Sequence, residues 1–155
     1  MHIFDVADYI IWKVCEAGET LNQLKMQKLA YYSEAWNWAI DDRELSGTSF
    51  QAWIHGPVSR ELFDRFKDTK SLYSPVALED TRPEFNPDNL DPDERAHIDR
   101  VLDVYAGLTG SQLETMTHSE EPWIEARTGY GPTERCEVEI RTETMRKYYG
   151  ARLKD

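Results

Sequence analysis

Residues 20–40 read TLNQLKMQKLAYYSEAWNWAI, and their apolar side chains recur with the period of an α-helix. These side chains fall on two sides of the predicted helix: Met26, Leu29, Trp36 and Ile40 on one, and Leu24, Tyr31, Ala35 and Trp38 on the other. A helix that is apolar on two sides packs between other elements. Thr20, with Gln23 three residues later, predicts the N-terminal cap. We therefore expect the central helix of a helical protein here.

Amphipathic segments with recognisable start signals surround this helix. The expected helix starts, in chain order, are Asp5, Thr20, Ser59, Asp91, Ser111, Pro122 and Thr142. The signal at Asp91 is strong, because Pro92 and then Glu94 follow in the order that a helix start favours. The pattern predicts a compact bundle of six to seven helices.

Two segments interrupt the helical pattern. Residues 43–54 combine small polar residues with Phe50 and Trp53, which predicts a short extended segment or β-hairpin. Gly56 and Pro57 are expected to turn the chain after it. Residues 68–90 are rich in Pro, Asp and Asn and predict a long loop. The fold class is thus mainly α, and residues 1–155 are expected to form a single domain.

The composition favours a protein ligand over a nucleic acid. Lys and Arg total 18 against 29 Asp and Glu, so the net charge of −11 repels a phosphate backbone. There is no charged N-terminal region followed by an apolar run and no membrane-spanning stretch, so we expect a cytoplasmic protein. The two cysteines are far apart in sequence and the histidines lack zinc-site spacing, so neither a metal nor another cofactor is expected.

A catalytic alternative stays open. Cys15 or Cys136 could act as a nucleophile if His55 or His118 lay beside it in the fold. A thiol beside the apolar stripe of a helix is more often a small hydrophobic side chain, and the glycines form no phosphate-binding loop. A small hydrolase is therefore an alternative hypothesis, and our prediction is a protein without enzymatic activity.

Three motifs stand out in order along the chain. The first is Lys25-Met26-Gln27-Lys28-Leu29, followed by Tyr31, Tyr32 and Trp36; the second is AWIHGPV at residues 52–58; the third is Thr117-His118 with Pro122-Trp123. Their order and spacing resemble the SocA-like antitoxin family, also called the Panacea domain or the GepA-like phage-associated proteins, from about Val6 to Tyr149. Met26 replaces the usual leucine, and His55 stands where tyrosine is common.

The resemblance implies an antitoxin of a two-gene pair that neutralises its cognate toxin by direct binding. A second reading is a proteolytic adaptor that delivers the toxin to a Clp-type protease. A third is a phage-associated interaction protein that has no toxin. A net charge of −11 would suit a basic toxin, because complementary potentials speed encounter.

Seven residues of these motifs are candidates for contact with the partner. They are Tyr32, Trp36, Trp53, His55, Pro57, His118 and Trp123. The alternative is that most of these aromatic side chains belong to the core and that Gly56 and Pro57 only shape a turn. In that case the acidic loop from Asp80 to Asp93 is the expected partner surface.

Overall fold

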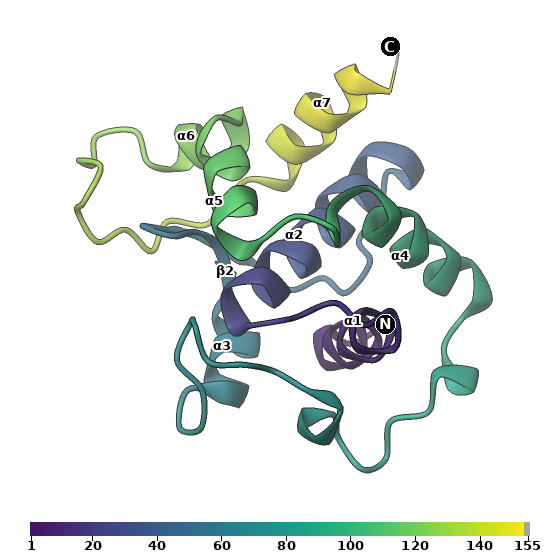
Figure 1. The fold of residues 1–155 in the computed structure, drawn as a ribbon. Coiled ribbons are helices and arrows are strands. Elements are labelled where there is room, and N and C mark those ends of the chain that lie inside the picture. Colours follow the sequence, from purple (N-terminus) through teal and green to yellow (C-terminus); the bar gives the residue numbers. More distant parts are fainter. Residues whose placement is uncertain (154–155) are drawn as a thin grey trace.

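The computed structural model describes residues 1–153. Over these residues the chain forms seven α-helices and a two-stranded antiparallel sheet (Figure 1). The helices are α1 (Ile3–Glu16), α2 (Gln23–Asp41), α3 (Arg60–Phe66), α4 (Pro92–Tyr105), α5 (Gly110–His118), α6 (Glu121–Ala126) and α7 (Thr142–Arg152). The strands are β1 (Phe50–Trp53) and β2 (Gly56–Ser59). The predicted fold class, a mainly helical bundle with a short hairpin, is confirmed.

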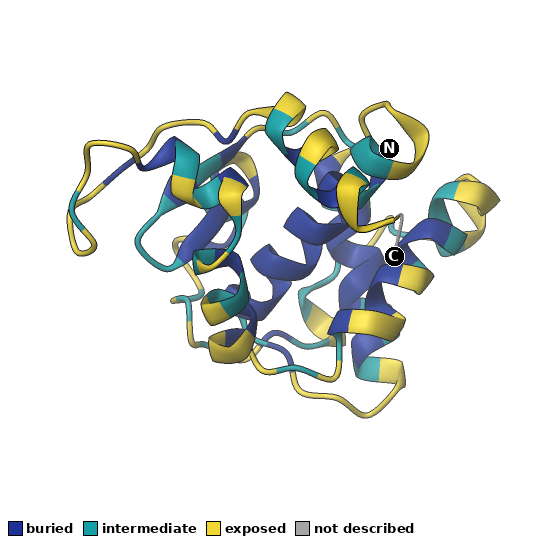
Figure 2. Ribbon diagram, turned by 90° about the horizontal axis from the view of Figure 1, so that it is seen from above, coloured by how far each residue is buried: buried dark blue, intermediate teal, exposed yellow. Residues whose placement is uncertain are grey.

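Helix α2 is the central helix, as its two apolar sides predicted. It runs through the middle of the molecule, with α1 and α4 on one side and α5 and α7 on the other (Figure 1). Figure 2 shows it buried over most of its length. Only its C-terminal end reaches the surface. There the Ile40 side chain is exposed, although the sequence pattern placed it on a packed side of the helix.

Several helix starts differ from the predicted ones because a nearer side chain reaches the free backbone N–H groups. Helix α1 begins two residues before Asp5, since His2 Nδ1 accepts a hydrogen bond from the Phe4 amide at 3.0 Å. Helix α2 is capped by Asn22, whose side chain accepts from the amide of Lys25 at 2.8 Å, and not by Thr20.

The remaining predicted starts agree to within one or two residues. Ser59 and Asp91 cap α3 and α4 as predicted, with side-chain oxygens that accept from amides three residues on. Helix α5 is capped by Thr109, two residues before Ser111. Thr142 is the first residue of α7 and not its cap.

The hairpin lies a few residues later than expected. Residues 43–49 are not paired as a strand, because the Glu34 carboxylate accepts hydrogen bonds from the amides of Leu45 and Ser46 at 2.8 and 3.0 Å and folds them against α2. Strand β1 pairs with β2 from Phe50↔Ser59 to Trp53↔Gly56, so the turn is at residues 54–55. Gly56 and Pro57 therefore belong to β2 and do not turn the chain.

Both edges of this small sheet make hydrogen bonds with other parts of the chain. On the β1 side, residues 138–140 add a short bridge, with hydrogen bonds from the Ala52 amide to the Val138 carbonyl (2.9 Å) and from the Ile140 amide to the Phe50 carbonyl (2.7 Å). On the β2 side, the buried side chain of Gln27 bonds the backbone of Ser59. The hairpin is thus held on both sides and has no free edge that invites a further strand.

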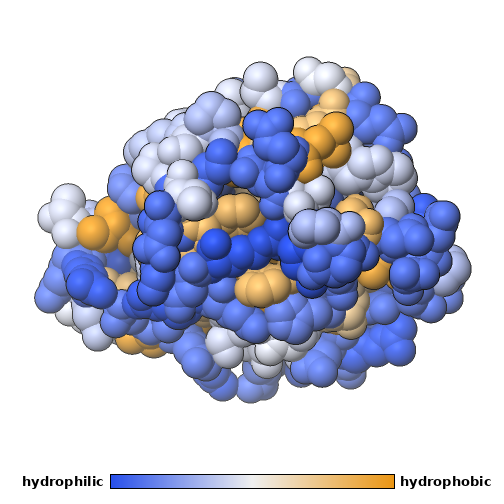
Figure 3. Space-filling model, turned by 90° about the horizontal axis from the view of Figure 1, so that it is seen from below, coloured by the Kyte–Doolittle hydropathy of each residue, from blue (hydrophilic) through white to orange (hydrophobic). Residues whose placement is uncertain are grey.

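The segment from residue 67 to 91 crosses the surface with two short 3₁₀ turns, Leu78–Asp80 and Pro87–Asn89. Backbone hydrogen bonds join it to the start of α2. Figure 3, seen from the side on which this segment lies, shows apolar side chains in separate patches between polar ones. In the part of the chain that the structure describes, no helix has the length and apolar character needed to cross a bilayer.

Candidate functional site

Polar side chains of the first motif are buried and bind backbone groups of other segments. Lys25 Nζ donates to the Ala106 carbonyl at 2.6 Å, at the end of α4. Gln27 Oε1 accepts from the Ser59 amide at 2.9 Å, while Gln27 Nε2 donates to the Ser59 carbonyl at 3.2 Å. Met26 lies in the core between them. These residues hold α2 against α4 and β2, so their role is architectural.

The second motif forms the end of the hairpin, residues 53–57, which we call the hairpin tip. The half-buried Trp53 ring meets the Phe63 ring edge to face, with centroids 5.0 Å apart. His55 is 44% exposed, and its Nδ1 lies 3.2 Å from Glu114 Oε1 of α5. Pro57 is buried, and its carbonyl accepts a hydrogen bond from Lys28 Nζ at 3.0 Å.

The third motif packs against the hairpin tip. The rings of His118 and Trp123 stack with centroids 4.0 Å apart. Trp123 Nε1 donates to the Trp53 carbonyl at 2.9 Å, and the buried Arg127 donates to the Ala52 carbonyl at 2.9 Å. Motifs that are some 60 residues apart in sequence thus meet at one place. The predicted residues brought together here are Trp53, His55, Pro57, His118 and Trp123, which we call the tip cluster.

Burial keeps the imidazole of His118 neutral. Burial lowers its pKa below the ordinary value, while Glu114 and a hydrogen bond with the Ile54 backbone act in the opposite direction. Among the described residues, no hydrogen-bond partner reaches its buried Nε2.

An apolar hollow of about 370 Å³ opens beside the hairpin tip. Most of its walls are hydrophobic: Trp53, Ile54, Val58, Phe63, Leu72 and Cys136 line it, with His55, Arg60, Arg135 and Glu137 at the polar positions. The Arg60 guanidinium lies over the Trp53 ring at 4.9 Å from the centroid, and Arg60 and Arg135 share the carboxylate of Glu137. A hollow of this kind suits an apolar side chain of a partner.

Tyr32 and Trp36 lie further along α2 and do not join the tip cluster. The Tyr32 hydroxyl donates to Glu120 Oε1 at 2.8 Å, and the Tyr149 hydroxyl donates to the same oxygen at 2.8 Å. Trp36 Nε1 donates to the hydroxyl of Tyr105 at 2.9 Å. Tyr32 is fully buried, so in this structure it packs the core.

Glu120 is half-buried, and its carboxylate accepts hydrogen bonds from two tyrosine hydroxyls. Burial raises its pKa above the ordinary value, and the hydrogen bonds from Tyr149 and Tyr32 oppose that shift. Burial together with Glu120 raises the pKa of Tyr32 well above the usual tyrosine range. The tyrosines therefore stay protonated and act as donors.

The cysteines have surroundings that disfavour a nucleophile. Burial raises the pKa of the half-buried Cys15 thiol, which keeps it protonated. Cys136 is buried, and its Sγ lies 3.9 Å from the Ala126 carbonyl. Over residues 1–153, no group of three or more His, Cys, Asp or Glu side chains is arranged to hold a metal ion.

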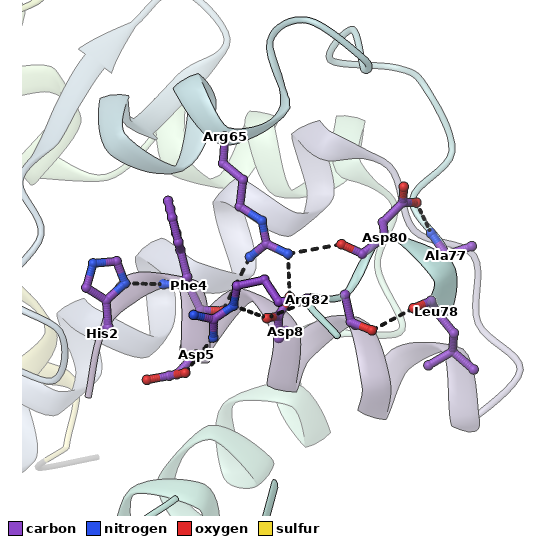
Figure 4. A network of polar contacts seen from close by, with 10 residues as sticks. His2, Phe4, Asp5, Asp8, Arg65, Ala77, Leu78, Asp80 and Arg82 are labelled. Carbon is purple, nitrogen blue, oxygen red and sulfur yellow. Dashed lines mark hydrogen bonds and ion pairs between the residues drawn. The ribbon is translucent and has the colours of Figure 1, made fainter. Parts of the chain in front are cut away.

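A buried ion network, which no sequence pattern predicted, holds the 67–91 segment. Asp8 of α1 is fully buried, and its two carboxylate oxygens each lie 2.6 Å from an arginine, Arg65 Nη2 and Arg82 Nε (Figure 4). Arg82 also contacts Asp5 at 2.5 Å, and Arg65 donates to the Asp80 carbonyl at 3.0 Å. No periodicity of the sequence signals these long-range pairs.

Comparison with known proteins agrees with the resemblance that the three motifs suggested. No curated protein matches the chain, and no solved structure does. The family model described as "Antitoxin SocA-like, Panacea domain" matches residues 26–124, from the first motif to the third. The matched region contains five of the seven α-helices, α2 to α6, in full or in part, together with the hairpin and the whole tip cluster. The chain therefore belongs to the SocA-like antitoxin family and carries its Panacea domain.

Proposed function

We propose that the domain neutralises a cognate toxin by direct protein–protein binding and that the tip cluster is the centre of the binding face. Family membership supports an antitoxin-type role, a protein partner and a non-enzymatic function. One observation carries the choice of face: residues from separate motifs converge beside an apolar hollow of about 370 Å³. Aromatic side chains beside an apolar hollow are frequent anchors of protein interfaces.

We propose two roles for residues of the tip cluster: contact with the partner and positioning of the hairpin tip. Trp53 and His55 have exposed surface and are the proposed contact residues. Pro57 is buried and Trp123 bonds the hairpin backbone, so both are proposed to position the tip. Tyr32 is buried in the core, and Trp36 lies nearer the C-terminal end of α2, away from the tip cluster. Their contact with a partner stays a prediction.

Co-expression with the product of the adjacent gene tests the proposal. If that product is toxic, the domain should restore growth and co-purify with it, also in cells that lack the Clp protease. Rescue that disappears without the protease while binding persists would establish the proteolytic adaptor instead. An adjacent product that is harmless and does not bind would favour the phage-associated interaction protein.

Matched variants test the binding face. Trp53→Ala and His55→Ala should each weaken the complex by at least about 2 kcal/mol, roughly thirtyfold in Kd. The controls are Trp12→Ala and His2→Ala. Trp12 is a half-buried tryptophan of α1, and His2 resembles His55 in lying beside a glutamate, with its Nε2 3.1 Å from Glu61. Melting temperatures of all four variants separate lost contact from lost folding. Equal losses in the tip and control variants would contradict the proposed face.

The acidic balance predicts the kinetics of binding. With a net charge of −11, association with a basic toxin should slow as salt is raised, while dissociation changes little. Stopped-flow measurements at two or three ionic strengths test this. An association rate that does not respond to salt would show that charge steering plays no part.

A further inference from the structure

The hollow beside the hairpin tip combines apolar walls with a charged rim. Its walls come from the hairpin, the first turn of α3, Leu72 of the 67–91 segment and residues 135–137. Two of the wall residues, Trp53 and Phe63, are aromatic, and the volume of about 370 Å³ is in the range of small-ligand sites. The hollow therefore has room for one large apolar side chain.

The rim carries more positive than negative charge. Arg135 Nη2 donates to Glu137 Oε1 at 2.8 Å, and Arg60 Nη2 donates to the same oxygen. Over residues 1–153, the guanidinium groups of these two arginines make no other hydrogen bond or ion pair. A guanidinium has five N–H donors, so both arginines keep donors that no acceptor of the protein takes. Two cations thus share one carboxylate.

The neighbouring carboxylates have other contacts and do not cancel this excess. Glu134 Oε1 accepts from the Gly131 amide at 2.9 Å. Glu139 lines a separate hollow that includes Glu34. Glu114 of α5 lies 3.2 Å from the His55 ring and is not among the residues that line the hollow. In a chain of net charge −11, the rim of this hollow is therefore locally cationic.

The wall that carries Arg135 is fixed relative to the hairpin. The buried Arg127 guanidinium donates to the Ala52 carbonyl of β1 at 2.9 Å and to the Glu134 carbonyl, directly before Arg135, at 2.6 Å. One side chain thus joins the strand that leads to Trp53 with the segment that carries the cationic rim. A hollow whose walls are joined in this way is formed before a partner arrives, which lowers the entropic cost of binding.

We propose that the hollow binds a partner segment in which a large apolar side chain is followed by a carboxylate. The apolar side chain fills the hollow, and the carboxylate binds Arg135, whose side chain is 81% exposed and whose planar fork suits two parallel hydrogen bonds. Arg135 is thereby a specificity-determining residue. Only the identification of this segment as part of a toxin rests on the proposed function. A basic toxin can carry such a segment, because net charge steers the approach while the rim acts on the residues in contact.

Blocked dipeptides test this recognition on the whole chain without any toxin. The probes are acetylated and amidated Phe-Glu, Phe-Gln and Phe-Lys, each titrated into the isotope-labelled protein while the indole N–H signal of Trp53 is followed by NMR. Phe-Glu should bind about threefold more tightly than Phe-Gln, a difference typical of an exposed ion pair, and Phe-Lys should bind least. The preference for Phe-Glu should shrink as salt is added.

Variants of Arg135 separate charge recognition from folding, because this side chain is exposed. Arg135→Gln should lower the affinity for Phe-Glu to that for Phe-Gln and leave Phe-Gln unchanged, and Arg135→Glu should reverse the preference toward Phe-Lys. The matched control is Arg141→Gln. Arg141 is 63% exposed and pairs with a glutamate two residues on, Glu143, at 3.0 Å, but it does not line this hollow. This control should bind all three peptides as the wild type does.

The outcomes that overturn the proposal are distinct. If no peptide moves the Trp53 signal up to its solubility limit, the hollow does not take an apolar side chain of this kind. Equal affinities for the three peptides exclude recognition of a carboxylate. A preference for Phe-Glu that survives in Arg135→Gln, or disappears in Arg141→Gln, excludes the role of Arg135. Growth rescue and co-purification with the toxin do not depend on these peptides, so they judge the proposed function separately.

Discussion

Replacing Asp8 with alanine should destabilise the domain by about 3 kcal/mol, because it leaves two partly buried arginines, Arg65 and Arg82, without their buried carboxylate. Asp8 is fully buried and lies 2.6 Å from both Arg65 and Arg82. Removing one partner of a buried ion pair typically costs about 3–5 kcal/mol, since the remaining charge has lost both water and partner.

The structure places the expected value at the lower end of that range. The Arg65 side chain is only 11% exposed and would keep little beyond backbone carbonyls as acceptors. Arg82 is 25% exposed and retains Asp5 at 2.5 Å, so its loss is partly compensated. For a chain of this size, about 3 kcal/mol corresponds to a fall in melting temperature of roughly 6–12 °C.

Thermal unfolding followed by circular dichroism measures the change, and limited proteolysis reports whether the 67–91 segment is released. The matched control is Asp64→Ala, which breaks an exposed pair with Lys67 at 3.8 Å and should change stability by less than about 0.5 kcal/mol. If Asp8→Ala unfolds at the same temperature as Asp64→Ala, the network does not stabilise the fold and the reasoning from burial is refuted.

Three further variants test other parts of the structure. Glu120→Gln should remove a pH dependence of the free energy of unfolding. Because the pKa of Glu120 is raised in the folded state, its contribution to stability is fully present below the unfolded pKa of 4.5 and is lost as pH rises through the folded pKa. In denaturant titrations, the stability of the wild type relative to the variant should therefore increase as pH falls. Gly56→Ala should lower stability by about 2–4 kcal/mol in the same assay, because it combines positive φ with a clash against Lys28. Cys15→Ser with Cys136→Ser should leave neutralisation in the growth assay intact; loss of protection by a folded double variant would restore the hydrolase hypothesis.

Local signals predicted the helices well, and long-range side-chain contacts account for the errors. The apolar pattern of residues 20–40 identified the central helix, because a helix with two apolar sides has few other places to pack. The hairpin lies later than predicted because Glu34, on α2, binds the backbone of Leu45 and Ser46. No pattern within residues 43–54 carries that information.

For the candidate site too, the sequence predicted the local features but not the long-range contacts. The motifs predicted which segments matter, and five of the seven residues selected from them meet in the tip cluster. The sequence did not indicate that Tyr32 is buried against Glu120, since a helix that is apolar on two sides does not show which aromatic residues face solvent. The sequence does not predict the Asp8 network, because Arg65 and Arg82 are 57 and 74 residues from Asp8 along the chain.

The polar side chains of the first motif fix the backbone of the hairpin tip, the proposed binding surface. Gln27 and Lys28 are adjacent on α2 and bind the backbone of β2 at Ser59 and Pro57, so two successive side chains fix the strand that leads from the tip. Trp123 fixes the other strand through the Trp53 carbonyl. A tip held from both strands loses little conformational freedom when a partner binds, and preorganisation of this kind raises affinity without adding contacts. If the tip is the binding face proposed above, replacing Gln27, Lys28 or Trp123 should therefore weaken neutralisation by loosening Trp53 and His55.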